Sequence, residues 1–339
     1  MEPIALFLAV LAAVLAVPVP KLLHRARFSA RSPRSAMLVW QAIALAGGLS
    51  LVGAPIVYGL SPFGGSLPQA VRTAFQLALE EDYAALSGLD VHPGHIFALC
   101  LGLLLAGHLL LTLIRTYLRV RSARRRHRQL VNLLSTPLGP DESPAVQALH
   151  PGRGLHEAQV IESAAPLAYC LPGRTNARSV TVLSRGLLEQ LTGAEVAAVV
   201  AHENTHLAQR HHLLTMAFEA WYRALPWLPT TRYGREAVLE LTEMLADDGA
   251  LGRHSHQDLL RALALSSPDT EAPAPDAQMT GFGAAATGQS TSGQPTLITG
   301  MRLQRLLLPP KPLGTGALVA IVSFSAALLA VPTVLLLSS

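Results

Sequence analysis

The chain has 339 residues, of which 50% are apolar and only 14% are charged. This composition is too apolar for a purely soluble protein of this length, and it favours a membrane protein. The net charge of +4 is modest, and its basic residues lie beside apolar runs, which argues against direct nucleic-acid binding. Two distant cysteines, Cys100 and Cys170, exclude a disulfide framework.

Three apolar segments predict an N-terminal membrane domain over residues 1–128, with spans at about 4–20, 36–58 and 96–114. Basic residues follow the first and third segments, whereas the loop between the second and third is acidic. Because Lys and Arg concentrate in cytoplasmic loops, this pattern predicts an N-terminus outside the cell. The third segment contains one ionisable residue, His108. We expect it to be neutral and hydrogen-bonded between helices, with an ion or proton role as the alternative.

Residues 129–266 predict a cytoplasmic domain that contains a small sheet. Strands are expected around Gln159–Ser163, at Leu167–Leu171 and at Ser179–Leu183, and the last two flank a turn at Pro172–Ala177. The edge of a strand that precedes a metal-binding helix can pair with an extended peptide. We assign that role to Leu167–Leu171.

The motif HENTH, His202–His206, matches the zinc-peptidase pattern H-E-x-x-H. On a helix, histidines four residues apart project from one side and can share one metal ion. Glu203 lies roughly 100° further round, where it can take a proton from water at the metal. A capping box of Thr192 and Glu195 predicts where this helix begins. Glu203 lies on the apolar stripe of the helix, where an unpaired carboxylate without a chemical role would be costly.

The third ligand of a catalytic zinc has two candidates. His212 fits the spacing H-E-x-x-H-x-x-G-x-x-H, but that arrangement needs a glycine where this chain has Gln209. We therefore expect His211 and His212 to lie at a solvated or membrane-facing helix end.

Glu243 is the stronger candidate, because Glu243 and Asp247 lie four residues apart among small alanines. A carboxylate ligand beside a second carboxylate that holds a ligand imidazole is a common pairing at zinc sites. Glu240, one turn earlier, is the main competitor. Arg253 and His254 follow this segment and are candidates for stabilising an oxyanion.

The end of the chain returns to the membrane. Trp221, Trp227 and their proline neighbours predict an aromatic core with a broken turn, and the alternative is an apolar corner in the membrane interface. Residues 267–300 predict a flexible linker. Residues 301–339 predict a juxtamembrane segment and a fourth span at about 313–337, which leaves both termini outside.

HENTH followed by E-M-L-A-D-D resembles the gluzincin peptidases, and most closely the BlaR/MecR-type membrane zinc metallopeptidases. The order of the features is also the same as in those proteins: three spans, a basic juxtamembrane stretch, A-Y-C-L-P-G, the two motifs and a last span. The resemblance implies that His202, His206 and Glu243 bind one Zn²⁺ ion, that Glu203 is the catalytic base and that Asp247 is the acid that holds a ligand imidazole. It also implies an α-helical membrane protein with four transmembrane helices and a cytoplasmic α+β zincin-like domain.

The expected function is hydrolysis of peptide bonds in a protein or peptide substrate on the cytoplasmic face of the plasma membrane, in regulatory signalling such as cleavage of a transcriptional repressor. Antibiotic-sensing members carry a penicillin-binding domain after the last span, which we do not expect here because the sequence ends at Ser339. The alternatives are an HtpX-type quality-control peptidase and a non-catalytic, zinc-bound signalling or scaffold protein. The charges around HENTH argue against an intramembrane zinc protease.

Overall fold

Helices make up most of the computed structural model, which describes residues 1–80 except 25 and 27, residue 89, and residues 91–137, 158–171, 173, 179–266 and 300–338. These residues form two compact units. The first contains Met1–Ile114, Phe218–Ala237 and Pro312–Ser339, and the second contains Arg115–Ala217 and Val238–Lys311. The predicted turn at Pro172–Ala177 lies outside the described residues except for residue 173, and the predicted linker lies outside them up to residue 299.

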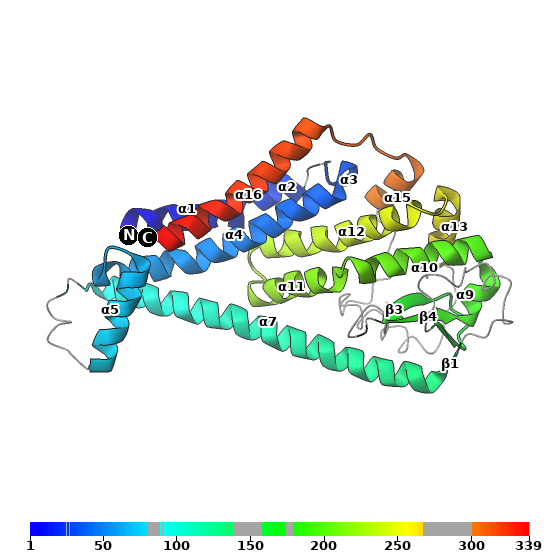
Figure 1. The fold of residues 1–339 in the computed structure, drawn as a ribbon, viewed down its shortest axis with the longest axis horizontal. Coiled ribbons are helices and arrows are strands. Elements are labelled where there is room, and N and C mark those ends of the chain that lie inside the picture. The colour runs from blue at the N-terminus through cyan, green and yellow to red at the C-terminus, as the bar shows by residue number, and fades with distance from the viewer. Residues whose placement is uncertain are drawn as a thin grey trace. The chain divides into compact units, whose positions relative to one another are not determined.

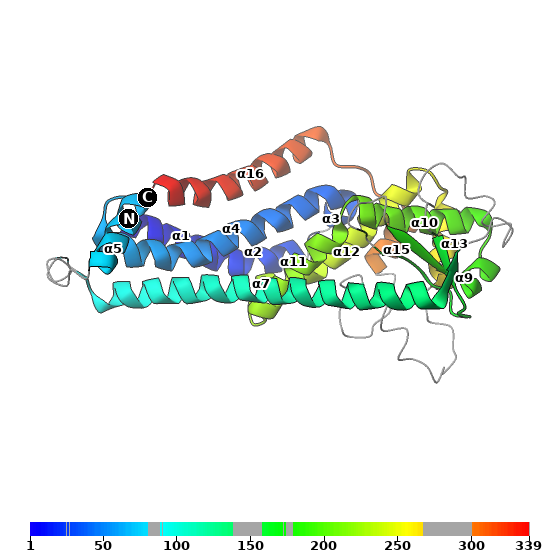
Figure 2. The ribbon, with the colours of Figure 1, turned by 60° about the horizontal axis from the view of Figure 1, so that its bottom comes forward.

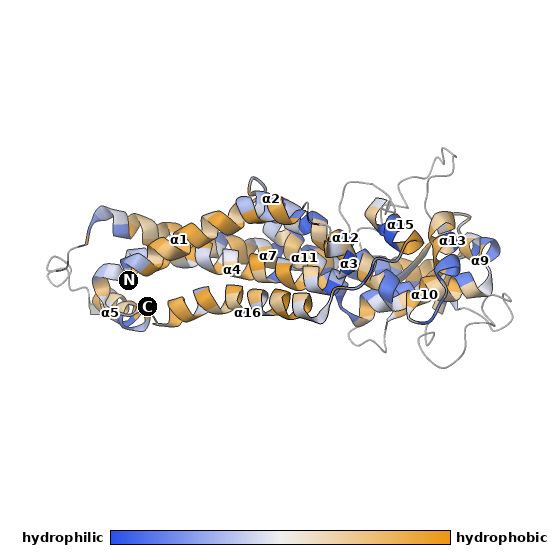
Figure 3. Ribbon diagram, turned by 90° about the horizontal axis from the view of Figure 1, so that it is seen from above, coloured by the Kyte–Doolittle hydropathy of each residue, from blue (hydrophilic) through white to orange (hydrophobic). Residues whose placement is uncertain are grey.

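The first unit is built from long apolar helices. Its helices before residue 93 are α1 (Glu2–Ala16), α2 (Pro18–His24), α3 (Phe28–Arg31), α4 (Pro33–Leu60), the short 3₁₀ helix η1 (Ser61–Phe63) and α5 (Leu67–Glu80). The start of α7 (Pro93–Leu134) and all of α16 (Thr315–Ser338) complete it. Helix α4 packs against both α1 and α16, and the three helices can be followed in Figure 1. These three helices are mostly apolar along their length (Figure 3).

Close packing in this unit depends on a glycine in α4. A Cβ atom at Gly59 would lie 2.7 Å from the carbonyl oxygen of His95 and 2.7 Å from the backbone nitrogen of Leu99, both on α7. Such distances are shorter than any real Cβ contact, so only glycine allows the two backbones to approach this closely.

Four described helical segments are long and apolar enough to cross a membrane. They are Glu2–His24, Pro33–Phe63, Pro93–Leu134 and Thr315–Leu337. Their positions agree with the four predicted spans, although length and composition alone define them.

The corner between α11 (His211–Ala224) and α12 (Pro229–Leu251) belongs to the first unit. Ala224, Leu225 and Leu228 are buried there against four apolar residues of the candidate spans, namely Ala16, Leu51, Leu105 and Leu109. His108 Nε2 lies 3.0 Å from the carbonyl oxygen of Ala224, which is the hydrogen bond between helices that the sequence predicted. The corner therefore packs among the candidate spans, and Trp227 at its tip is 73% exposed.

The second unit contains a four-stranded sheet. Its strands are β1 (Ser135–Pro137), β2 (Ala158–Ile161), β3 (Ala168–Leu171) and β4 (Val180–Ser184), in the spatial order β1-β2-β4-β3. Strands β2 and β4 are parallel, and the two outer pairs are antiparallel. The sequence located β2, β3 and β4 to within two residues, but it missed β1, which is only three residues long and ends in proline.

Helices cover both faces of this sheet. One face packs against α9 (Arg185–Gln190), α10 (Gly193–Ala208) and α13 (His256–Ser266), through a core that includes Leu183, Leu187 and Val196. The other face contacts Val131, near the end of α7, through Leu171 and Val182. Helix α10 contacts β3, and Figure 2 shows α10 next to the strands of the sheet. Strand β3 lies at an edge of the sheet, and among the described strands only β4 pairs with it.

Candidate metal centre

Helix α10 begins where the sequence predicted. The Thr192 hydroxyl accepts a hydrogen bond from the Glu195 backbone N–H at 3.4 Å, and the Glu195 carboxylate accepts one from the Thr192 N–H at 2.8 Å. This capping box satisfies two donors at the helix start. Val196, Val199 and Val200 then bury the helix against the sheet core, which fixes the side from which His202 and His206 project.

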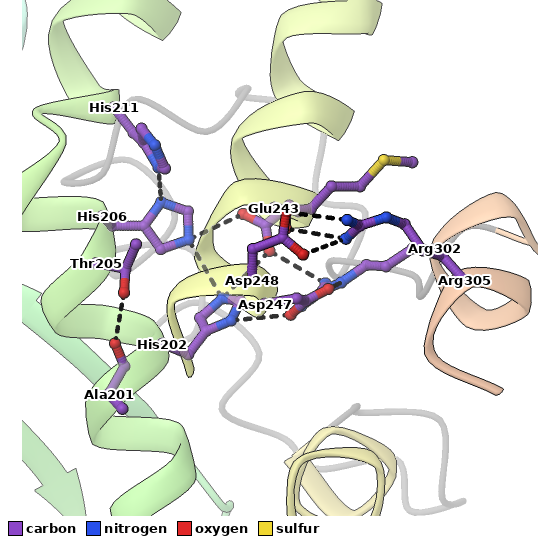
Figure 4. Close-up of polar contacts among 11 residues, drawn as sticks. Ala201, His202, Thr205, His206, His211, Glu243, Asp247, Asp248, Arg302 and Arg305 are labelled. Carbon is purple, nitrogen blue, oxygen red and sulfur yellow. Dashed lines mark hydrogen bonds and ion pairs between the residues drawn. The ribbon is translucent and has the colours of Figure 1, made fainter. Parts of the chain in front are cut away.

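The two histidines meet a carboxylate from α12, as Figure 4 shows. His202 Nε2 lies 3.2 Å from His206 Nε2 and 3.6 Å from Glu243 Oε2, and His206 Nε2 lies 3.4 Å from Glu243 Oε1. Ligands of a tetrahedral zinc ion, bound at about 2.0–2.1 Å, lie about 3.3 Å from one another. Taking one ligand atom from each residue, the three atoms lie within 4.8 Å of one another, so the three side chains could hold one metal ion.

A glycine lets α12 come this close to α10. A Cβ atom at Gly249 would collide with the side chain of Thr205, one residue before His206. Ala246 and Ala250 on the same helix are completely buried. The small residues that the sequence showed around Glu243 thus lie at the contact between the two ligand-bearing helices.

The outer nitrogen of His202 faces Asp247. Its Nδ1 atom lies 3.0 Å from Asp247 Oδ1, at an angle too oblique for a regular hydrogen bond. Asp247 is 1% exposed. The structure thus gives Asp247 the place beside a ligand imidazole that its spacing from Glu243 predicted.

Two arginines on α15 (Gly300–Leu307) complete the polar cluster, and the sequence did not reveal their role. The guanidinium of Arg302 donates two hydrogen bonds to Asp247, at 2.6 and 2.8 Å, and its Nη1 lies 3.1 Å from Glu243 Oε2. Arg305 pairs with Asp248 at 2.6 Å. Two adjacent aspartates on one buried helix were the available signal, because buried carboxylates need cationic partners.

Electrostatics keep both acids charged. Burial alone would raise the pKa of Glu243, but His206, His202 and Arg302 outweigh it and hold that pKa well below its usual range. Arg302 and His202 likewise lower the pKa of Asp247 against the effect of burial. Two ionised carboxylates thus face one guanidinium and the imidazole of His202.

The histidines differ in their protonation. Burial lowers the pKa of His206 to about 3, so this imidazole is neutral and can donate a lone pair to a metal. Burial also opposes protonation of His202, but Asp247 and Glu243 outweigh it and raise the pKa of His202 to about 10. Metal binding must therefore displace a proton from His202.

Glu203 lies between α10 and the edge strand. Packing around its carboxylate, part of which solvent still reaches, raises its pKa to about 7 against the opposing effect of His202. The carboxylate also accepts a hydrogen bond from the backbone of Cys170 on β3. A carboxylate poised near neutral pH is suited to general-base chemistry.

The other residues that the sequence suggested for the site do not belong to the donor group. Glu240 is not part of the donor group that the described residues form. Arg253 is exposed and His254 is half-buried after the end of α12, and in the described structure no contact joins either to the cluster. His212 does not contact the donor atoms, but His211 is 3% exposed and lies 3.0 Å from His206. The predicted solvated helix end is therefore wrong for His211.

Comparison with known proteins gives one match. Residues 142–246 match the model of Peptidase family M48, a segment that contains HENTH and Glu243. No curated protein and no solved structure matches the chain. The narrower assignment to the BlaR/MecR type stays a prediction. Together, the match and the His-His-Glu cluster support a metallopeptidase of the M48 family in this part of the chain.

Proposed function

We propose that the protein is a membrane-anchored zinc metalloendopeptidase that cuts a protein substrate on the cytoplasmic side. The observation that carries this proposal is the convergence of His202, His206 and Glu243, whose ligand atoms lie within 4.8 Å of one another, with Glu203 next to His202 in the motif. Three protein ligands are typical of catalytic zinc, whereas structural sites normally have four.

The residues divide the work of peptide hydrolysis. A zinc ion at this site supplies Lewis acidity, which makes water more acidic and polarises a carbonyl group. Glu203 takes a proton from the attacking water and passes it to the leaving amine, a role that its pKa of about 7 supports. Asp247 orients His202, and Arg302 neutralises Asp247.

The edge of β3 that faces away from β4 supports an extended substrate. The Ser184 N–H donates to the Leu167 carbonyl at 2.9 Å, so Leu167 and Ser184 are a hydrogen-bonded pair in the antiparallel ladder. In such a ladder the alternate residues, Ala168 and Cys170, direct their backbone groups away from β4. A peptide paired along this edge would pass Glu203, which already contacts the Cys170 backbone.

The membrane location and the signalling role are parts of the same proposal. Four apolar helices support membrane anchoring, and the arginines at 115–128 support a cytoplasmic position for the residues that follow. We propose a cytoplasmic regulatory protein, such as a transcriptional repressor, as the substrate.

The test is metal content and cleavage with the full chain purified in detergent. Wild type should contain about one zinc ion per chain and cut itself or an unfolded protein. Glu203→Gln should keep the zinc and lose roughly 10²–10⁴-fold in rate. Glu189→Gln, at an exposed position on α9, is the matched control and should behave as wild type. Zinc without cleavage by wild type would favour the non-catalytic alternative, and equal cleavage by Glu203→Gln would refute the assigned base.

A further inference from the structure

The junction between α10 and α11 contains a break in the helix. Helix α10 ends at Ala208, and Arg210 has a φ of 52°, the one positive value for a non-glycine residue within the described ranges. A left-handed backbone is unfavourable at a residue with a Cβ atom. The surrounding structure must therefore favour this turn.

The break redirects His211. Had the helix continued, His211 would lie about 140° around the axis from His206, on a different face. Instead, the two rings meet nearly perpendicular, with centroids 4.9 Å apart and an interplanar angle of 88°. Their Nδ1 atoms are 3.0 Å apart (Figure 4). The left-handed turn at Arg210 thus places a second imidazole against the outer nitrogen of a ligand candidate.

The neighbouring hydrogen bond shows which of the two rings donates the proton in the contact between the Nδ1 atoms. His211 Nε2 lies 3.1 Å from Gln209 Oε1, and an amide oxygen can only accept. A neutral His211 therefore carries its proton on Nε2 and leaves Nδ1 free to accept. The proton between the two Nδ1 atoms then belongs to His206, which leaves the Nε2 of His206 bare toward Glu243 and His202.

We propose that His211 is a positioning residue that holds His206 in the tautomer and orientation needed for metal binding. Asp247 takes the corresponding place beside His202, so each ligand imidazole has its own outer partner. The partners differ in charge, because one is a carboxylate and the other a neutral ring. Using a neutral ring beside His206 avoids adding a third carboxylate to a cluster whose Arg302 already faces two.

This inference rests on the proposed zinc site, and the experiment separates the two. The full chain, purified in detergent and stripped of metal, is titrated with Zn²⁺ against a chromophoric chelator, and Co²⁺ loading gives a visible spectrum that reports the ligand geometry. If wild type binds neither ion, the proposed function fails. If wild type binds and the His211 variants bind equally well, only the present inference fails.

Two substitutions separate positioning from packing. His211→Asn keeps an acceptor near the place of Nδ1, whereas His211→Leu keeps the bulk and removes the acceptor. We expect His211→Leu to lose about 10–100-fold in zinc affinity with an altered Co²⁺ spectrum, the usual effect of removing an outer partner. His211→Asn should restore most of that affinity. His212→Leu, the neighbouring histidine without contact to the donor atoms, should bind as wild type.

Melting of the metal-free proteins shows whether folding is the cause. Positioning predicts that His211→Leu and His211→Asn melt alike without metal but differ in zinc affinity. If both variants lose metal-free stability and zinc affinity to the same extent, His211 fills space only and the proposal is overturned. If His211→Leu does not fold, Gln209→Leu, at an exposed position, removes the acceptor that orients His211. It should lower zinc affinity, and wild-type affinity for it would overturn the proposal.

Discussion

The metal centre and the apolar helices are held by opposite kinds of contact. In the second unit, the side chains of Asp247, Arg302 and His202 are buried, and each meets a particular charged or polar partner. In the first unit, Leu8 and Ile43 are also buried, and each packs in a cluster of apolar side chains. Because hydrogen bonds and ion pairs are directional, the stability of the metal centre depends on individual donor and acceptor atoms. Non-directional packing tolerates exchange between side chains of similar volume, so the two regions should respond differently to substitution.

The largest effect is expected at the carboxylate ligand. Glu243→Ala removes one of three donors, and we expect zinc affinity to fall by at least about 100-fold. Competition with a chelator measures it. Glu240→Ala, one turn earlier on the same helix, is the control and should leave the affinity unchanged. A reversed outcome would give the ligand role to Glu240.

Arg302→Gln should produce the next largest effect. It leaves Asp247 and Glu243 buried without their guanidinium, and breaking a buried pair typically costs about 3–5 kcal/mol of unfolding free energy. Chemical denaturation of the metal-free protein measures this loss. The same change at exposed Arg253 should cost almost nothing.

The pH dependence of stability gives this pair a second test. Because the pKa of Asp247 is lowered in the folded protein, its ionised form contributes stability above the ordinary value of about 3.9. That contribution disappears as the pH falls from there through the lowered folded pKa. Arg302→Gln brings the folded pKa closer to the ordinary value, so the variant should lose less stability as the pH falls. Denaturation in EDTA from pH 7 down to about pH 2 would show a shallower decline for the variant, and equal losses in the two proteins would contradict the pairing.

Gly249→Ala tests the close approach of the two ligand helices. The new methyl group meets Thr205, and overpacking of this kind costs about 1–3 kcal/mol. Thr205→Ala removes the atoms nearest to the methyl group and should recover part of the loss. Additive effects in the double-mutant cycle would mean that the two positions do not touch.

The smallest effect is expected in the apolar region, at the hydrogen bond between His108 and the Ala224 carbonyl. His108→Leu removes the hydrogen bond to the Ala224 carbonyl, and comparable bonds in membrane proteins contribute about 0.6 kcal/mol. Thermal unfolding in lipid bicelles measures it, with Leu104→Ile at an exposed position as the control. If His108→Leu cost more than Arg302→Gln, the contrast between the two regions would fail.

Local patterns in the sequence account for much of the site. The helical period places His202 with His206 and Glu243 with Asp247, and the capping box marks the start of α10. The same period misplaced His211, because it assumes a regular helix and Arg210 leaves that conformation. The role of Arg302 could not be predicted for another reason. Its partner Asp247 lies 55 residues earlier in the sequence, and helical or strand periodicity gives no information about pairs so far apart.

That separation also orders events during synthesis. Asp247 and Asp248 are translated well before Arg302 and Arg305, the cations that neutralise them, 55 and 57 residues later. A growing polypeptide therefore lacks these two cationic partners until the ribosome has passed residue 305. The buried polar cluster around Asp247 can be completed only near the end of translation.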